Sequence, residues 1–205
     1  MENNIDNMNR LRLNETYSPT LEAAMADRPW GEAEARQVDE KLRSIYSDNG
    51  VSAFCYLLFD PRKFDARVEN VTLSSFVDAI FYVGKGTGAR PLHHLIDAKR
   101  LMKFPEEMSN KTKIIHEIWD AEKGVIALQM SHHIDDDEAL TREAAIIEAI
   151  GLANLSNVKP GMMQGTTKTW SAVQRAQLGT LLLVRARNIL VAEGHIKQIF
   201  PNNLP

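Results

Sequence analysis

Residues 82–94 of this 205-residue chain read YVGKGTGARPLHH. An apolar run over 79–83 predicts a short buried strand before the glycines, and a helical pattern begins at Arg90. Glycine lets backbone N–H groups approach an anion closely, and a helix start offers unpaired N–H donors. Lys85 and Arg90 add positive charge, and His94 follows Arg90 by four residues, on the same predicted helix face. The stretch therefore indicates phosphodiester chemistry.

The glycines alone match no established phosphate-binding loop. They lack the Gly-Lys-Ser/Thr of a P-loop, and their spacing differs from the dinucleotide-binding Gly-x-Gly-x-x-Gly. A flexible strand-to-helix connection is one open alternative. An enzyme that uses the turn to bind a free nucleotide is another, although no adenine or ribose signature accompanies it.

Composition is typical of a soluble globular protein, with 44% hydrophobic and 25% charged residues. The length suffices for one domain with its own core, and no apolar run approaches the roughly 20 residues that span a bilayer. The N-terminus has no signal-peptide pattern, and Cys55 is the single cysteine, which leaves no internal disulfide or zinc cluster. We therefore expect an intracellular protein, cytoplasmic or nuclear, that is neither secreted nor membrane-bound.

Charge is unevenly distributed along the chain. The net charge is −3, which argues against a protein that coats nucleic acid indiscriminately. Residues 82–103, however, hold five Lys or Arg against one Asp, and residues 159–205 hold six against one Glu. These basic islands predict a local contact with an anionic ligand.

Hydrophobic periodicity predicts a small α/β or α+β domain. Residues 1–29 are polar and irregular and are expected to form a flexible arm, followed by one domain over 30–200 with its core at 52–161. Helices are expected at 30–46, 73–78, 91–103, 111–122, 135–150 and 171–193, and strands at 52–60, 80–83 and 125–131.

Glu143 lies at the border of the apolar stripe on the predicted 135–150 helix. A carboxylate at the edge of a core can hold Mg²⁺ together with waters and a phosphate oxygen. The alternatives are a solvated side chain or an ion pair with Arg142 or Arg90. The neighbouring His132, His133 and residues 135–137 resemble metal ligands, but the aspartates occupy cap and first-turn positions, so capping is the preferred interpretation.

The order of these motifs resembles the GIY-YIG nuclease superfamily, which has two tyrosine-bearing strands, an Arg/His helix, a metal-binding glutamate and a late asparagine. The similarity is greater to the ankyrin-repeat and LEM-domain endonucleases of animals. It covers roughly residues 52–195 and is carried by YLLFDPR at 56–62, IFYVGKGT at 80–87, TREA at 141–144 and LSNV at 155–158.

The sequence departs from the superfamily pattern at three points. The first motif reads Phe-Cys-Tyr at 54–56 and keeps only the tyrosine. The gap between Tyr56 and Tyr82 is longer than in most of the superfamily, although the ankyrin and LEM branch also has an insertion there. Ankyrin repeats and a LEM domain are absent, so the targeting that those modules provide does not carry over.

The resemblance implies a central three-stranded antiparallel sheet flanked by helices, with an extra N-terminal helix and a long C-terminal helix. It implies hydrolysis of DNA phosphodiesters with one Mg²⁺ or Mn²⁺, bound by Glu143. Tyr56 would orient or deprotonate the attacking water, with Tyr82 beside it. Arg90 would stabilise charge on the phosphate, and His94 would assist proton transfer or hold the phosphate.

Four further residues are predicted to bind substrate: Gly84, Lys85, Gly86 and Asn157. Lys85 and Arg90 supply the cations that a tyrosine, with an ordinary pKa of about 10, needs to ionise at neutral pH. An alternative for Asn157 is that it orients the loop after the helix.

The resulting hypothesis is a metal-dependent DNA endonuclease of genome maintenance and DNA repair, selective for branched, flapped or distorted DNA. No small-molecule cofactor is expected, and the oligomeric state is not predicted. The alternative is a catalytically silent DNA-binding module of the same fold, which would bind DNA without metal-dependent nicking.

Overall fold

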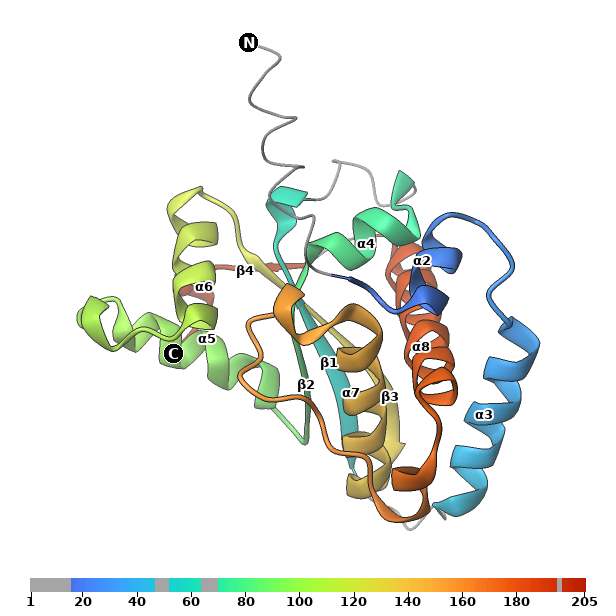
Figure 1. The fold of residues 1–205 in the computed structure, drawn as a ribbon. Coiled ribbons are helices and arrows are strands. Elements are labelled where there is room, and N and C mark those ends of the chain that lie inside the picture. Colours follow the sequence, from blue (N-terminus) through green and yellow to red (C-terminus); the bar gives the residue numbers. More distant parts are fainter. Residues whose placement is uncertain (1–15, 47–51, 64–69, 195–196) are drawn as a thin grey trace.

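The fold is α+β, built on one four-stranded antiparallel sheet with helices on both faces (Figure 1). A computed structural model describes residues 16–46, 52–63, 70–194 and 197–205. Strand order in the sheet is β2-β1-β3-β4. The strands span Ala53–Phe59 (β1), Ile80–Gly86 (β2), Val125–Ile134 (β3) and Gln198–Ile199 (β4).

The larger helical layer covers one face of the sheet (Figure 1). It comprises α2 (Pro19–Met25), α3 (Glu32–Ile45), α4 (Leu73–Ala79), α7 (Asp136–Ile150) and α8 (Ala172–Glu193). The opposite face is covered by α5 (Arg90–Leu101) and α6 (Asn110–Asp120). Short 3-10 turns occupy 61–63, 105–107, 152–154, 165–169 and 201–203. No helix in the described ranges is long and apolar enough to cross a membrane.

Strand β1 is buried along its whole length because both of its faces are covered. Cys55, Leu57 and Phe59 point into the core under α7 and α8. Tyr56 and its neighbours on the other face pack into the core under α5 and α6. A strand that is buried on both faces needs a continuous apolar run, which is what residues 53–59 provide.

The caps of the long helices follow directly from the sequence. Asp135 caps α7 by accepting a hydrogen bond from the Asp137 amide at 2.8 Å. Ser171 and Gln174 form a capping box at the start of α8, and Gly194 ends it in the left-handed conformation (φ 66°). The capping interpretation of the aspartates at 135–137 is thereby confirmed.

Three expectations need correction. The sheet has a fourth strand, because Gln198 and Ile199 pair with Ile126 and Val125; a two-residue strand carries no periodicity of its own. Strand β2 continues to Gly86, so two glycines of the proposed turn lie in the sheet. The flexible-arm prediction for 1–29 is wrong over Pro19–Met25, where a serine cap and a proline at the first position start α2. Residues 1–15 lie outside the described part.

The crossing of α7 and α8 depends on Gly179. A Cβ at this position would lie 2.1 Å from the carbonyl oxygen of Ala145 and 2.8 Å from the Cβ of Ala149. The two helices approach so closely that only a hydrogen atom fits between their backbones.

We predict that Gly179→Ala destabilises the protein although alanine is the better helix former. Alanine gains up to about 1 kcal/mol of helix propensity, but overpacking against a backbone atom costs about 1–3 kcal/mol or more. Chemical denaturation should therefore show a net loss. Val173→Ala, at an exposed position of the same helix, should change the free energy of unfolding by no more than about 0.5 kcal/mol. Stabilisation by Gly179→Ala would contradict the packing described here.

Candidate active site

The pairing of β1 with β2 brings the two tyrosine motifs together. Tyr56 lies opposite Gly84, and Leu58 lies opposite Tyr82. A Cβ at Gly84 would lie 2.4 Å from Cζ of Tyr56 and 2.5 Å from its hydroxyl oxygen. Gly84 is therefore required by the ring of Tyr56, which crosses directly over it. The rings of Tyr56 and Tyr82 lie 6.1 Å apart.

Helix α5 places His94 beside Tyr56. The Nε2 atom of His94 lies 2.6 Å from the Tyr56 hydroxyl oxygen, and both side chains are buried. At the start of the same helix, Arg90 packs its Cβ and Cγ against Gly86, where a Cβ would meet them at 2.5 and 2.4 Å. Arg90 is exposed at this N-terminus. Gly86 thus leaves room for the Arg90 side chain beside β2.

Lys111 was not singled out from the sequence, yet it completes this cluster. Its Nζ lies 2.9 Å from Nδ1 of His94 and 4.1 Å from the centroid of the Tyr82 ring. Lys111 lies in the first turn of α6, where a positive charge is disfavoured by the helix dipole. That local conflict is the one sequence signal that could have marked it.

Asn157 fills the open edge of β2. Its Oδ1 accepts a hydrogen bond from the Val83 amide at 3.0 Å, and its Nδ2 donates to the Val83 carbonyl at 2.8 Å. Next to it, the Ser156 amide and hydroxyl both donate to the carbonyl oxygen of Phe81. These bonds supply the partners that an edge strand otherwise lacks. The geometry supports the alternative in which Asn157 orients its loop, while its substrate contact stays a prediction.

A cavity of about 390 Å³ opens at this edge between β2, α6, α7 and the 156–161 loop. Tyr82, Lys111, Glu143 and Asn157 are among its lining residues. Tyr56 and His94 lie behind Tyr82 and do not line it. The structure therefore gathers the predicted residues in one region, with Tyr82 and Glu143 facing the cavity.

Glu143 reaches the cavity from α7, where it is half-buried. Burial raises the pKa of Glu143, and the backbone N–H and ammonium of Lys85 partly oppose this rise. The ion pair considered with Arg142 does not form, because Arg142 binds Glu138 and Asp39 instead. Lys85 itself pairs with Asp136 at 2.5 Å.

Burial also decides the state of the tyrosines. It raises the pKa of Tyr56 well above the ordinary value of 10 and also raises the pKa of Tyr82, and the positive charge of Arg90 opposes both rises only in part. The expectation that Lys85 and Arg90 suffice to ionise a tyrosine is therefore wrong for the protein on its own. Desolvation outweighs the cations.

His94 is neutral at physiological pH. Burial lowers its pKa to about 3, and the charges of Lys111 and Arg90 act in the same direction. Burial and the charge of Arg90 also lower the pKa of Lys111 to about 8. Around pH 7 Lys111 is therefore mainly protonated and remains a hydrogen-bond donor to the imidazole.

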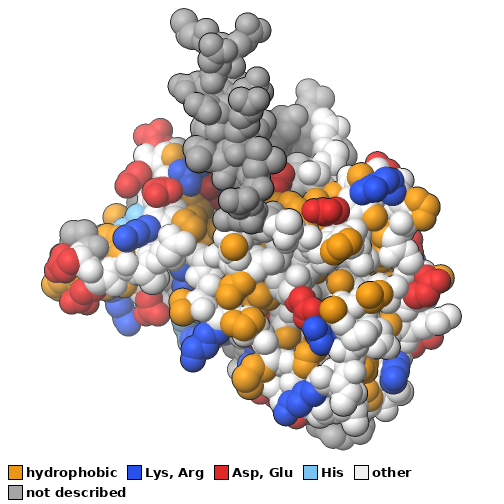
Figure 2. Space-filling model, viewed as in Figure 1, with side chains coloured by type: hydrophobic (Ala, Val, Ile, Leu, Met, Phe, Trp, Pro, Cys, Tyr) orange, Lys and Arg blue, Asp and Glu red, His pale blue; other side chains and the backbone are white. Residues whose placement is uncertain are grey.

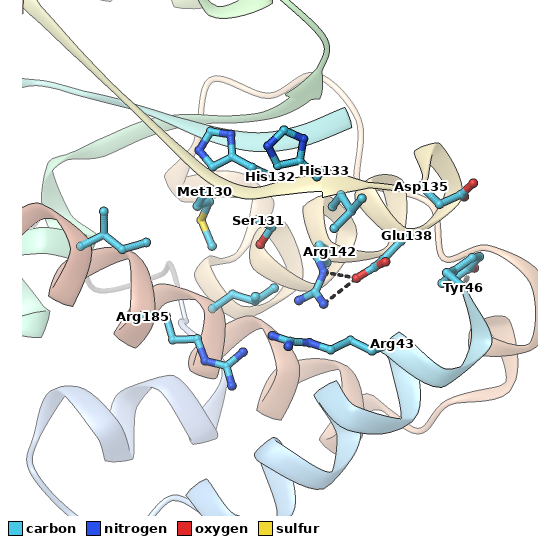
Figure 3. A pocket seen from close by; sticks show the side chains of 13 residues that line it. Arg43, Tyr46, Met130, Ser131, His132, His133, Asp135, Glu138, Arg142 and Arg185 are labelled. Carbon is cyan, nitrogen blue, oxygen red and sulfur yellow. Dashed lines mark hydrogen bonds and ion pairs between the residues drawn. The ribbon is translucent and has the colours of Figure 1, made fainter. Parts of the chain in front are cut away.

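A second cavity, of about 470 Å³, lies between the end of β3 and helices α3, α7 and α8 (Figure 3). Its charges are paired internally. Buried Asp39 binds Arg142 at 2.8 Å, Arg185 at 2.5 Å and Arg43 at 3.2 Å, and Glu138 binds Arg142 (Figure 3). None of the predicted site residues lines this cavity.

The histidines beside that cavity do not form a metal centre with the aspartates. His132 packs against Phe54, with ring centroids 5.8 Å apart, and Asp135 is engaged as the α7 cap. Within the described ranges, no three His, Cys, Asp or Glu side chains are grouped as a metal site would require. The absence of such a group does not concern a site built on one carboxylate, such as Glu143, because Mg²⁺ can bind through a single carboxylate together with waters and a phosphate.

Sequence comparison identifies a family and relatives for this chain. The sequence model of the "LEM-3-like GIY-YIG domain" matches residues 53–205. The chain belongs to the LEM-3-like GIY-YIG family.

The GIY-YIG family assignment is supported by curated relatives. The chain is 47% identical over 176 residues to the Ankyrin repeat and LEM domain-containing protein 1 homolog of Caenorhabditis elegans, covering 83% of this chain and 25% of that protein. It is 41% identical over 164 residues to the Homo sapiens Ankyrin repeat and LEM domain-containing protein 1, covering 75% of this chain and 26% of that protein. The chain thus spans about a quarter of the length of these relatives. No solved structure matches it.

Membership of the GIY-YIG family implies a nuclease that hydrolyses phosphodiester bonds. The charge distribution is consistent with a local rather than a general contact with nucleic acid. On the face shown in Figure 2, basic and acidic side chains are interspersed, with no single sign dominating. Two lysines, Lys111 and Lys159, line the cavity at the edge of β2, and the charge of Arg90 acts on His94 behind it.

We predict that this GIY-YIG domain loses stability in acid partly through His94. An unfolded-chain histidine binds its proton near pH 6.5, whereas His94 does so only near pH 3. Between these values the folded state binds fewer protons, so its stability falls as the pH falls. The slope contributed is up to about 1.4 kcal/mol per pH unit.

Urea denaturation of wild type and His94→Asn at several pH values between about 4 and 7 measures this contribution. The variant should be less stable at neutral pH but have a shallower pH dependence. Equal slopes in the two proteins would show that His94 is not held neutral by the fold.

Proposed function

We propose that this protein is a metal-dependent DNA endonuclease, selective for branched or flapped DNA in genome maintenance, whose active site is the cavity at the edge of β2. The observation that carries the proposal is the gathering of Tyr82, Lys111 and Glu143 around one cavity with the Tyr56–His94 pair directly behind it. Membership of a nuclease family supports the reaction class.

Glu143 is the residue that would hold Mg²⁺ or Mn²⁺. Its carboxylate is half-buried, faces the cavity and, among the described residues, forms no ion pair with Lys or Arg. Mg²⁺ keeps several of its waters and binds through one or two carboxylates plus substrate phosphate, so one glutamate and open space fit it. When bound, the metal supplies Lewis-acid stabilisation of charge that develops on the phosphate.

Arg90 is proposed to bind the scissile phosphate. It is exposed at the first turn of α5, and its charge alters the pKa values of Tyr56, Tyr82 and His94. It is therefore close to the reacting groups and still accessible to DNA. A guanidinium can make two parallel hydrogen bonds to a phosphate, which fixes the orientation of the scissile bond.

Tyr82 is proposed to contact the attacking water. Tyr82 lines the cavity, whereas Tyr56 is 1% exposed and has its hydroxyl bonded to His94. Tyr56 then acts through Tyr82 rather than on the water. Lys85, Gly84 and Gly86 are proposed to shape the approach of the DNA backbone beside β2.

Selectivity for branched DNA is the finer part of the proposal. The net charge is −3, and the basic groups of the site are few, so affinity for any regular duplex should be low. A distorted substrate that bends into the cavity would gain contacts that a straight duplex cannot make.

Cleavage of fluorescent flap, four-way junction and plain duplex DNA with Mg²⁺ tests the function. We expect cutting of the branched substrates, abolished by EDTA. Glu143→Gln should slow cutting at least about 100-fold by loss of metal binding, and Arg90→Ala about 100- to 1,000-fold by loss of charge stabilisation. The matched controls are Glu40→Gln on α3 and Arg100→Ala on α5, both exposed, which should cut normally.

Equal cutting by wild type, Glu143→Gln and Arg90→Ala would refute the site assignment. Salt-sensitive DNA binding without nicking by the wild-type protein at any metal concentration would instead identify a silent DNA-binding module. Equal rates on junction and duplex would remove the selectivity while leaving the nuclease.

A further inference from the structure

Three side chains from α6, α5 and β1 form a chain of hydrogen-bonding groups that begins at the cavity wall. Lys111 Nζ lies 2.9 Å from His94 Nδ1, and His94 Nε2 lies 2.6 Å from the Tyr56 oxygen. Lys111 lines the cavity, whereas His94 and Tyr56 lie behind it. The ring of Tyr82, which also lines the cavity, lies 6.1 Å from that of Tyr56.

Lys111 sets the direction of the hydrogen bonds that follow it. A protonated lysine has three donors and no acceptor, so the Nδ1 atom that it contacts must be the acceptor. A neutral imidazole with an acceptor at Nδ1 carries its proton on Nε2. His94 therefore donates to the Tyr56 oxygen, and the Tyr56 proton must point away from His94.

The opposite direction is disfavoured by the same geometry. If His94 carried its proton on Nδ1, that N–H would face the Lys111 ammonium, and two donors would meet 2.9 Å apart. The fully protonated imidazolium has the same conflict. The pKa of His94, which burial lowers to about 3, agrees with a neutral ring.

We propose that Lys111 is a positioning residue of the nuclease: by donating to Nδ1 of His94 it fixes the Nε2–H tautomer, so that His94 donates to the Tyr56 oxygen and the Tyr56 proton points away from His94. This inference rests on the proposed function. It gives the two tyrosines different tasks, with Tyr56 held in one orientation by His94 and Tyr82 as the group that faces the cavity.

The position of Lys111 over the Tyr82 ring reinforces this assignment. A cation 4.1 Å from the ring centroid interacts favourably with the electron-rich face. The same charge favours negative charge on the Tyr82 oxygen over a neutral hydroxyl. One ammonium therefore acts on Tyr82 directly and on Tyr56 through His94.

Nitrogen-15 NMR of the histidine rings tests the tautomer without DNA or metal. In the wild-type protein at neutral pH, His94 should show a protonated Nε2 and an unprotonated Nδ1. Lys111→Met, which keeps length but removes the donor, should give a mixture of tautomers or move the proton to Nδ1. Lys111→Arg should retain the wild-type pattern. Lys113→Met, an exposed lysine of the same helix, is the matched control.

Single-turnover cleavage of the branched substrate tests the catalytic consequence. Lys111→Met should lower the saturating rate constant by about 100-fold and change the half-saturating concentration by less than about threefold, because a positioning role acts on the reacting groups rather than on the affinity for DNA. Lys111→Arg should recover most of the rate, and Lys113→Met should cut as wild type does. Unchanged thermal unfolding of the variants excludes a loss of fold.

The outcomes separate this inference from the proposed function. A proton on Nδ1 in the wild type, or a tautomer unaffected by Lys111→Met, overturns the hydrogen-bond chain even if the protein cuts DNA. A tautomer that changes while the rate does not overturns the positioning role. A wild-type protein that never cuts overturns the nuclease proposal itself, whatever the NMR shows.

Discussion

The register between β1 and β2 is the constraint on which the whole candidate site depends. It places Tyr56 directly opposite Gly84, so that the aromatic ring crosses the neighbouring strand where no side chain obstructs it. Because successive residues of a strand alternate between faces, a shift of one residue would send Tyr56 into the opposite core. Strand β2 also places Tyr82 at the cavity and leads into α5, which begins with Arg90.

The open edge of β2 is what makes the cavity accessible. An edge strand exposes unpaired backbone groups, and here Ser156 and Asn157 form hydrogen bonds with those of Phe81 and Val83. The loop that supplies these bonds also forms the cavity wall. The proposed catalytic groups thus lie at the border between a dry core and solvent, where burial shifts pKa values and a substrate can still enter.

The groups behind the cavity are buried, whereas Arg90 is exposed, and this difference separates their roles. Tyr56 and His94 are desolvated enough to stay neutral, which suits groups that hold hydrogen bonds in a fixed direction. Arg90 remains exposed and charged, which suits contact with DNA. Lys111 lies between the two environments, with its pKa lowered to about 8 but its charge retained at neutral pH.

Much of the fold could be predicted from local signals. A continuous apolar run predicted that β1 is buried on both faces. Capping residues in the sequence predicted where α7 begins and where α8 begins and ends. Strand β4 could not be predicted, because Gln198 and Ile199 become a strand only by pairing with β3. The arm prediction failed over α2 for a related reason, since Leu21 is buried only through contacts with distant helices.

The sequence could nominate most residues of the candidate site but could not predict how they are arranged. The motifs identified Tyr56, Tyr82 and Glu143, but whether a tyrosine faces solvent or a histidine depends on tertiary packing. The glycines were first interpreted as phosphate contacts, whereas in the structure Gly84 makes room for Tyr56. Lys111 is 17 residues from His94 in sequence and belongs to no motif, so only the fold brings it into the cluster.

Anomalous diffraction at the manganese edge tests the central claim most directly. The crystals would contain this domain, Mn²⁺ and a branched DNA whose scissile phosphate is replaced by a non-hydrolysable analogue. The account predicts a manganese peak at coordination distance from the Glu143 carboxylate, with the analogue held between Arg90 and Tyr82. A manganese peak at the far end of β3 beside His132 would contradict the account, and so would DNA bound there with no manganese at Glu143.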